Sequence, residues 1–333
     1  MQKAMISNQQ NIPTNTHEEW QKSIPAQVFL NHFRSIDYYI RHTAPLEEVR
    51  QLSTLQRFNP KREGARVGAA KKWLLHAWSA EYTLRTAANH TDENYQKHSL
   101  HWTFPQAYYS VLYGAKAFLA IQGIDVPIEA VVGQIINGYV AKGWYPESIG
   151  FYVDGPLGHY TYHQLPQTTE PALLQPLETP KQAEAHIAQF LKTTRDLRLR
   201  TYRRRLQANP EKALRSKTGK IITKFGATHW EEIAKHTGPT TYFDLMSRLK
   251  ISGTQREIER FVEADIDVPK FHQSLLNIVK YLNFIHECYV AKVMGLKAYQ
   301  QWIEELPSYL RQSFLQQRYE NGIIPIVSAV TKF

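Results

Sequence analysis

FPQAYYSVLYGAKAFLAIQG, residues 104–123, has the clearest periodicity in the chain. Apolar side chains recur every three or four residues, which predicts an amphipathic helix with one buried face. Thr103 followed by Gln106 matches a capping box, with Pro105 in the first turn, and Gly123 is typical of a residue that ends a helix. The predicted buried stripe is Phe104, Tyr108, Val111, Leu112, Ala115, Phe118 and Leu119.

The same helical period extends outward over most of the chain, and we predict further helices at residues 69–88, 127–141 and 181–207. One segment differs. FYVDGPLGHYTYH, residues 151–163, has two short aromatic and β-branched runs around a Gly- and Pro-containing turn, which is typical of a β-hairpin. We therefore expect a mainly α protein with one small β-hairpin near 151–163.

A proline-rich stretch divides these elements. Residues 165–180 read LPQTTEPALLQPLETP, and four prolines at this spacing exclude a continuous helix. We predict a linker at 166–180 between two helical lobes. The first, 1–165, contains the 104–123 helix and the hairpin, and the second, 181–333, opens with a basic helix.

Composition indicates a globular chain. Of the 333 residues, 43% are hydrophobic and 21% are charged, which excludes wholesale disorder. The sequence has no run of about 18 apolar residues, so we expect no membrane association. The first 25 residues lack the apolar segment of a secretion signal. The single cysteine, Cys288, cannot form an internal disulfide, which favours a cytoplasmic protein.

We expect neither a cofactor nor a metal. The sequence contains no GxxxxGK[ST] phosphate loop, no GxGxxG and no HExxH motif. Four histidines are close in sequence, but their intervals do not repeat the four-residue step that puts two ligands on one helical face. These four residues are His76, His90, His98 and His101.

The charge is concentrated in one segment. The chain carries a formal net charge of +10. Between Lys192 and Lys224 there are twelve lysines and arginines and only two acidic residues, so this segment contains an excess equal to that of the whole chain. A basic segment attracts polyanions, of which nucleic acid is the commonest. The alternatives are a solvated helix face and a face that pairs with an acidic partner.

Within this segment Arg198, Arg205 and Lys212 follow one another at seven-residue steps, which would align them along a single helix. Such a line suits the phosphates of a nucleic acid, and Tyr202 is a candidate for stacking on a base. Nothing in the pattern separates RNA from DNA. The predicted nucleic-acid-binding residues are Arg195, Arg198, Tyr202, Arg203, Arg204, Arg205, Lys212, Arg215, Lys217 and Lys220.

The 104–123 segment resembles the central helix of HEPN-type proteins, and of the YaaC-like proteins of bacteria. The resemblance consists of Tyr108-Tyr109, Gly114-Ala115-Lys116-Ala117 and Phe118-Leu119. HEPN domains are all-α and occur in prokaryotic toxin–antitoxin and antiviral defence systems. The resemblance thus implies a component of a prokaryotic defence or mobile-element system. Together with the basic segment, it predicts a component that associates with RNA or DNA and is not catalytic by itself.

Active HEPN ribonucleases carry an Arg-x4–6-His motif, in which the arginine binds the scissile phosphate and the histidine transfers protons without a metal. Arg85 and His90 match this spacing here, although they precede the Tyr-Tyr helix and the family motif follows it. The resemblance therefore implies, as an alternative, a metal-independent endoribonuclease that uses Arg85 and His90. The sequence leaves open whether the protein is an enzyme.

A third possibility is a helical scaffold that binds a protein partner or a second copy of the chain. Six apolar residues between 271 and 289 recur at alternating steps of four and three, a seam suited to packing against another helix. The tail GIIPIVSAVTKF, residues 322–333, is unusually apolar and must dock on its own domain or on a partner. The seam consists of Phe271, Leu275, Ile278, Leu282, Ile285 and Tyr289.

Overall fold

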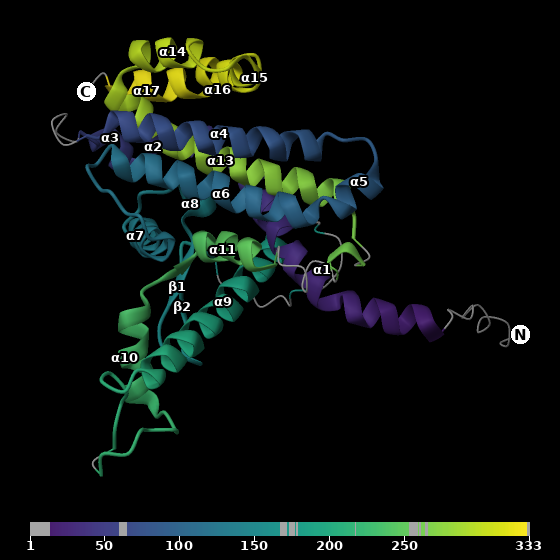
Figure 1. The fold of residues 1–333 in the computed structure, drawn as a ribbon, viewed down its shortest axis with the longest axis vertical. Helices are drawn as coiled ribbons and strands as arrows, with labels where there is room; N and C mark the ends of the chain where they lie inside the picture. Colours follow the sequence, from purple (N-terminus) through teal and green to yellow (C-terminus); the bar gives the residue numbers. More distant parts are fainter. Residues whose placement is uncertain are drawn as a thin grey trace, which may run out of the picture.

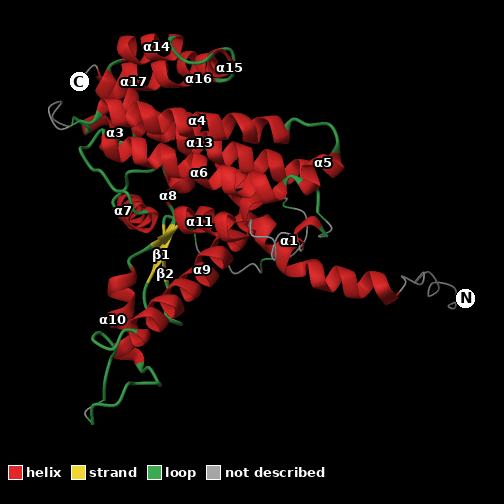
Figure 2. Cartoon of the chain, viewed as in Figure 1, coloured by secondary structure: helices red, strands yellow, loops and turns green. Residues whose placement is uncertain are grey.

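A computed structural model describes residues 14–59, 65–166, 172, 177, 179–216, 218–252, 259, 261–263 and 266–331. The chain is mainly helical with one small sheet (Figures 1 and 2), which confirms the predicted fold class. The elements before the sheet are α1 (Thr14–Arg41), α2 (Pro45–Gln51), α3 (Ser53–Arg57), α4 (Val67–Ala88), α5 (Glu93–His98), α6 (Leu100–Ala120), α7 (Glu129–Ala141) and α8 (Glu147–Gly150). The later elements are β1 (Tyr152–Asp154), β2 (Thr161–His163), α9 (Pro180–Ala208), α10 (Ala227–Thr237), β3 (Thr240–Thr241), α11 (Tyr242–Ser252), α13 (Val268–Met294), α14 (Leu296–Glu304), α15 (Ser308–Arg311), α16 (Leu315–Arg318), η2 (Tyr319–Ile323) and α17 (Ile324–Thr331).

The centre of the molecule is a bundle of α4, α6 and α13, each of which packs against the other two (Figure 1). A buried polar link joins them. The Asn283 amide of α13 donates to Glu81 of α4 at 2.9 Å and to Ser110 of α6 at 2.8 Å. Gly114 allows α6 to approach this amide, since an added Cβ would lie 2.7 Å from Asn283 Oδ1. Apolar contacts hold the three helices together, and these hydrogen bonds also fix their register.

The predicted helix at 104–123 is present, but its start is corrected. Helix α6 begins at Leu100, and the predicted capping box is wrong because the Thr103 hydroxyl donates to the Leu100 carbonyl from inside the helix. Leu100 is fully buried, so the apolar face gains a further turn N-terminal to the predicted start. The predicted end holds, because Gly123 has a left-handed φ of 79° and the Ile124 N–H donates to the Leu119 carbonyl at 3.1 Å.

The predicted hairpin is confirmed and gains a third strand. Strands β1 and β2 pair antiparallel, with Val153 opposite Tyr162, and β3 pairs antiparallel on the other side of β1. Strand β3 is only Thr240–Thr241, and two residues are too few to show a periodic pattern in sequence. The sheet fixes the chain between α10 and α11 against the hairpin.

The helices before and after the predicted linker share one hydrophobic core. Most of residues 166–180 lie outside the described ones, but α1 packs against both α9 and α13, and α11 packs against α6. Phe33 of α1, Phe118 of α6 and Phe190 of α9 belong to the same buried cluster. The N-terminal and C-terminal helices therefore do not form separate cores.

The C-terminal features that favoured a scaffold pack within the chain. All six seam residues of α13 are buried, and α13 contacts α1, α4 and α6. The apolar tail forms α17, which docks on α2, α3 and α13 and buries Ile326, Val327 and Val330. Among the described residues, no helix has both the length and the apolarity needed to cross a bilayer.

Candidate nucleic-acid interface

The basic segment forms an arm that projects from the bundle (Figure 1). The arm consists of residues 200–216 and 218–237, which are the last turns of α9, the connection that follows and α10. It contains nine lysines and arginines against three glutamates. Lys217, which the sequence also predicted as a contact, lies outside the described residues. The arm is thus the most strongly charged part of the described chain outside the bundle.

Arg195 is buried at the root of the arm, which corrects its prediction as a nucleic-acid contact. Its side chain is 1% exposed, and its guanidinium donates to the carbonyls of Gly155, Ala234 and Gly238. Burial, together with the neighbouring Arg198, lowers the pKa of Arg195 to about 10. The carbonyls at the end of α10 carry partial negative charge and lack helical donors, which explains why a cation is buried there.

Arg198 also donates its hydrogen bonds to groups of this chain, which corrects its prediction as a nucleic-acid contact. Its guanidinium donates to the Thr237 carbonyl at 2.7 Å, to Pro239, and to the Asp244 carboxylate at 2.9 Å. Asp244 in turn accepts from the Asn137 amide at 2.9 Å, and burial raises the pKa of this carboxyl. Arg198 therefore fastens α9 to α11, and its charge is paired with Asp244.

The remaining basic side chains of the arm are available to solvent. Among the described residues, none of the lysines and arginines from 200 to 224 forms an ion pair with a carboxylate of this chain. A helix that carries such charges unpaired repels itself, so a polyanion would relieve the repulsion. The exposed members are Arg200, Arg204, Arg205, Lys212, Arg215, Lys220 and Lys224.

The predicted single line of charges is broken after Arg205. Helix α9 ends at Ala208, and Pro210 prevents its continuation, so Lys212 lies in the connection and not on the helix. The connection is ordered by its own hydrogen bonds. Arg215 donates to the carbonyls of Gly219 at 2.9 Å and Pro210 at 3.1 Å. The basic residues therefore occupy a helix end and a folded loop.

Aromatic side chains lie between the two sides of the arm. The Arg203 guanidinium lies over the rings of Phe225, at 5.5 Å, and Trp230, at 5.7 Å. Tyr202 stacks on His236 with ring centres 6.0 Å apart. One face of Tyr202 is thus already covered, and Arg203 is half-buried by its rings. The sequence did not indicate the contact of Phe225 and Trp230 with α9, because the two residues belong to no shared periodic pattern and reach α9 only through the turn of the connection.

Arg85 and His90, the predicted ribonuclease pair, lie at the end of α4. Arg85 donates to buried Glu81 at 2.6 Å and covers the Phe314 ring at 3.8 Å. His90 is exposed beyond the helix, where its Nδ1 accepts from the Asp92 amide at 3.1 Å. No hydrogen bond joins the two side chains in the part of the chain that the structure describes. Arg85, the cation that would have to bind the phosphate, is thus already paired with Glu81.

Two basic residues of α11 reach the root of the arm without having been predicted. Arg248 donates to the Thr194 hydroxyl of α9 at 3.2 Å, and Lys250 pairs with Glu129 of α7 at 2.7 Å. They are distant in sequence from the basic segment, so only the packing of α11 against α7 and α9 brings them there. No group of three or more potential metal ligands gathers among the residues in view.

Comparison with known proteins gives no relative. No family model, no curated protein and no solved structure matches the chain.

Proposed function

We propose that the protein is a cytoplasmic component of a prokaryotic defence or mobile-element system that associates with nucleic acid, RNA or DNA, through the arm. The defence context comes only from the resemblance of residues 104–123 to HEPN-type helices. The nucleic-acid part rests on a separate observation. The arm projects from the bundle (Figure 1), and its exposed cations between 200 and 224 form no ion pair with a carboxylate of this chain among the described residues.

The protein binds in this proposal and does not cleave by itself. Arg85 donates two hydrogen bonds to Glu81, so it is not free to hold a scissile phosphate. RNA cleavage that persists in EDTA and disappears in His90→Ala would contradict this part of the proposal.

Electrostatic binding predicts a steep salt dependence. Each phosphate contact releases condensed counterions, so log K should fall against log salt with a slope of about −0.7 per contact for a single strand. We expect fluorescence anisotropy with a labelled single-stranded RNA to give a slope that corresponds to several contacts. The same strand as DNA, and both duplexes, would show which nucleic acid the arm prefers.

A matched pair of variants tests whether the arm is responsible. Arg204→Glu/Lys212→Glu/Lys220→Glu reverses three exposed arm charges. Lys72→Glu/Lys142→Glu/Lys297→Glu makes the same change in net charge at exposed positions outside the arm. The salt slope of the arm variant should correspond to about three fewer phosphate contacts, and its affinity for the nucleic acid should fall at least tenfold. Equal losses in the two variants would show general charge attraction and overturn the proposal.

A further inference from the structure

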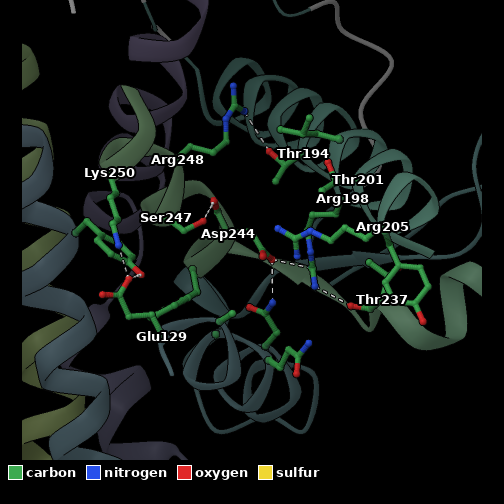
Figure 3. A pocket seen from close by; sticks show the side chains of 18 of the residues that line it. Glu129, Thr194, Arg198, Thr201, Arg205, Thr237, Asp244, Ser247, Arg248 and Lys250 are labelled. Atoms are coloured by element: carbon green, nitrogen blue, oxygen red, sulfur yellow. Dashed lines mark hydrogen bonds and ion pairs between the residues drawn. The ribbon is translucent and has the colours of Figure 1, made fainter. Parts of the chain in front are cut away.

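A cavity of about 560 Å³ lies at the root of the arm, between α7, α9 and α11 (Figure 3). Its volume falls in the range of about 300–1,000 Å³ that small-ligand sites occupy, which is large enough for one nucleotide. Figure 3 shows Glu129 and Lys250 on one side and Arg198 and Arg205 on the other, with Arg248 at the top of the view. Three helices distant in sequence therefore build one cationic recess.

The charge of the lining favours an anion. Four lining residues are lysine or arginine and two are carboxylates, which leaves two positive charges in excess. The Arg198–Asp244 pair is internally satisfied, because Asp244 also accepts from Asn137 and from the Thr241 amide. Lys250 is likewise paired with Glu129, whereas Arg205 is exposed without a carboxylate partner among the described residues and is the cation that we assign to the anion.

The other lining groups suit a sugar and a base. Gln134 offers an amide that no described side chain engages, and Leu197 presents an apolar surface that is 48% exposed. The Thr201 hydroxyl accepts from Arg204 at 3.2 Å and keeps its own proton to donate. Glu129 lies on the far wall, where one carboxylate oxygen accepts from both Tyr108 and Lys250. Its second oxygen has no hydrogen-bond donor among the described residues, and a ribose hydroxyl is a suitable donor.

Arg205 connects the cavity to the arm. It lines the cavity and is also one of the exposed arm cations, whereas its neighbour Arg204 is exposed on the arm and does not line the cavity. A strand held by the arm would thus present its end to this recess. A terminal phosphomonoester carries nearly two negative charges at neutral pH and an internal phosphodiester carries one, so the monoester is attracted more strongly to Arg205.

We propose that this cavity binds the phosphomonoester of a nucleotide, supplied by the phosphorylated end of a strand that the arm holds. The inference rests on the proposed function, since the arm delivers the end. Arg205 contacts the phosphate in this arrangement, and the hydroxyl and amide groups of the lining contact the sugar and base.

Two labelled RNAs of one sequence, one with a terminal phosphate and one with a hydroxyl, test the inference, with the phosphate placed at the 5′ end and then at the 3′ end. We expect the phosphorylated strand to bind about tenfold more tightly at one of the two ends. Arg205→Gln should abolish this preference. Lys212→Gln removes one positive charge from an exposed arm position that, among the described residues, neither lines the cavity nor contacts its lining, and should weaken both strands equally, with the preference kept.

The outcomes separate this inference from the proposed function. Titration with AMP and adenosine identifies the source of the phosphate: AMP binding that is lost in Arg205→Gln and kept in Lys212→Gln, without an end preference, would support phosphate recognition with a free nucleotide as the ligand. Salt-dependent strand binding with neither an end preference nor AMP binding, or a preference that Arg205→Gln leaves intact, would overturn the cavity inference alone. Absence of binding to both RNA and DNA would overturn the proposed function.

Discussion

Two arginines on α9 illustrate how differently one residue type is used along a single helix. Arg195 is buried and donates only to backbone carbonyls, whereas Arg204 is exposed and donates to Thr201 of its own helix. Nothing in their immediate sequence separates them. The difference arises because the end of α10 lies against one face of α9 and not against the other.

Replacement of Arg195 by methionine should destabilise the protein by about 1–3 kcal/mol, because the carbonyls of Gly155 and Gly238 would stay buried without their donor. Methionine keeps much of the side-chain volume, so the loss reports on the hydrogen bonds. Urea denaturation measures the change. Arg200→Met, at an exposed position of the same helix, should change stability by less than about 0.5 kcal/mol. Equal stability of the two variants would show that the buried hydrogen bonds contribute nothing.

At the scale of the element, α10 is held to α9 by few contacts. Ile233 is the only apolar residue of α10 that is buried among those described. The other contacts with α9 include the hydrogen bonds from Arg195 and Arg198 to carbonyls in the last turn of α10, the Trp230 ring near Arg203 and the Tyr202–His236 stack. An element with little buried apolar area opens locally at low cost. The arm should therefore exchange its amide hydrogens earlier than α4, α6 and α13.

Trp230→Ala should loosen α10 from α9, since it removes one of the rings over Arg203. A cation–π contact of about 1 kcal/mol corresponds to roughly fivefold faster amide exchange in residues 227–237. Hydrogen–deuterium exchange with mass spectrometry measures this directly.

Trp102→Ala provides the control for that experiment. Trp102 is 65% exposed on α6, so its loss should leave exchange in α10 unchanged. Unchanged exchange in Trp230→Ala as well would mean that the ring does not hold α10 in place.

At the scale of the whole molecule, the core contains histidines that must stay neutral. His32 of α1 and His286 of α13 are buried, and burial lowers the pKa of each to about 3. His286 has one polar contact, the Tyr145 hydroxyl at 2.8 Å, and stacks on Phe118. In the unfolded chain the pKa of histidine returns to about 6.5. The unfolded state therefore binds more protons than the folded state between pH 6.5 and about 3.

This difference predicts that the free energy of unfolding falls as the pH falls through that window, by up to ~1.4 kcal/mol per pH unit for each such histidine. The contribution is complete above pH 6.5, where both states are neutral. In His286→Gln the free energy of unfolding should change less steeply with pH, because one of the two buried histidines no longer contributes. Urea denaturation at several pH values measures this slope. His98→Gln, at an exposed position, should keep the original slope, and the same slope in all three proteins would contradict the assignment.

Local sequence determined the elements, while tertiary packing determined the use of the charges. The period of Phe104, Leu112 and Phe118 established a buried helix, and the two short runs around Gly155 established a hairpin, because both patterns arise within a few residues. The start of α6 and the two-residue strand β3 were not predictable in this way, since a buried Leu100 and a partner strand decide them.

The candidate site was predicted in outline only. Composition located the basic segment, and the exposed Arg204, Arg205 and Lys220 agree with that prediction. The burial of Arg195, the pairing of Arg198 with Asp244, and the arrival of Arg248 and Lys250 at the cavity that Arg205 lines depend on how α9, α10 and α11 pack. A charge has the same sequence signature whether it faces water or a buried carbonyl, so only the folded arrangement distinguishes a binding cation from a structural one.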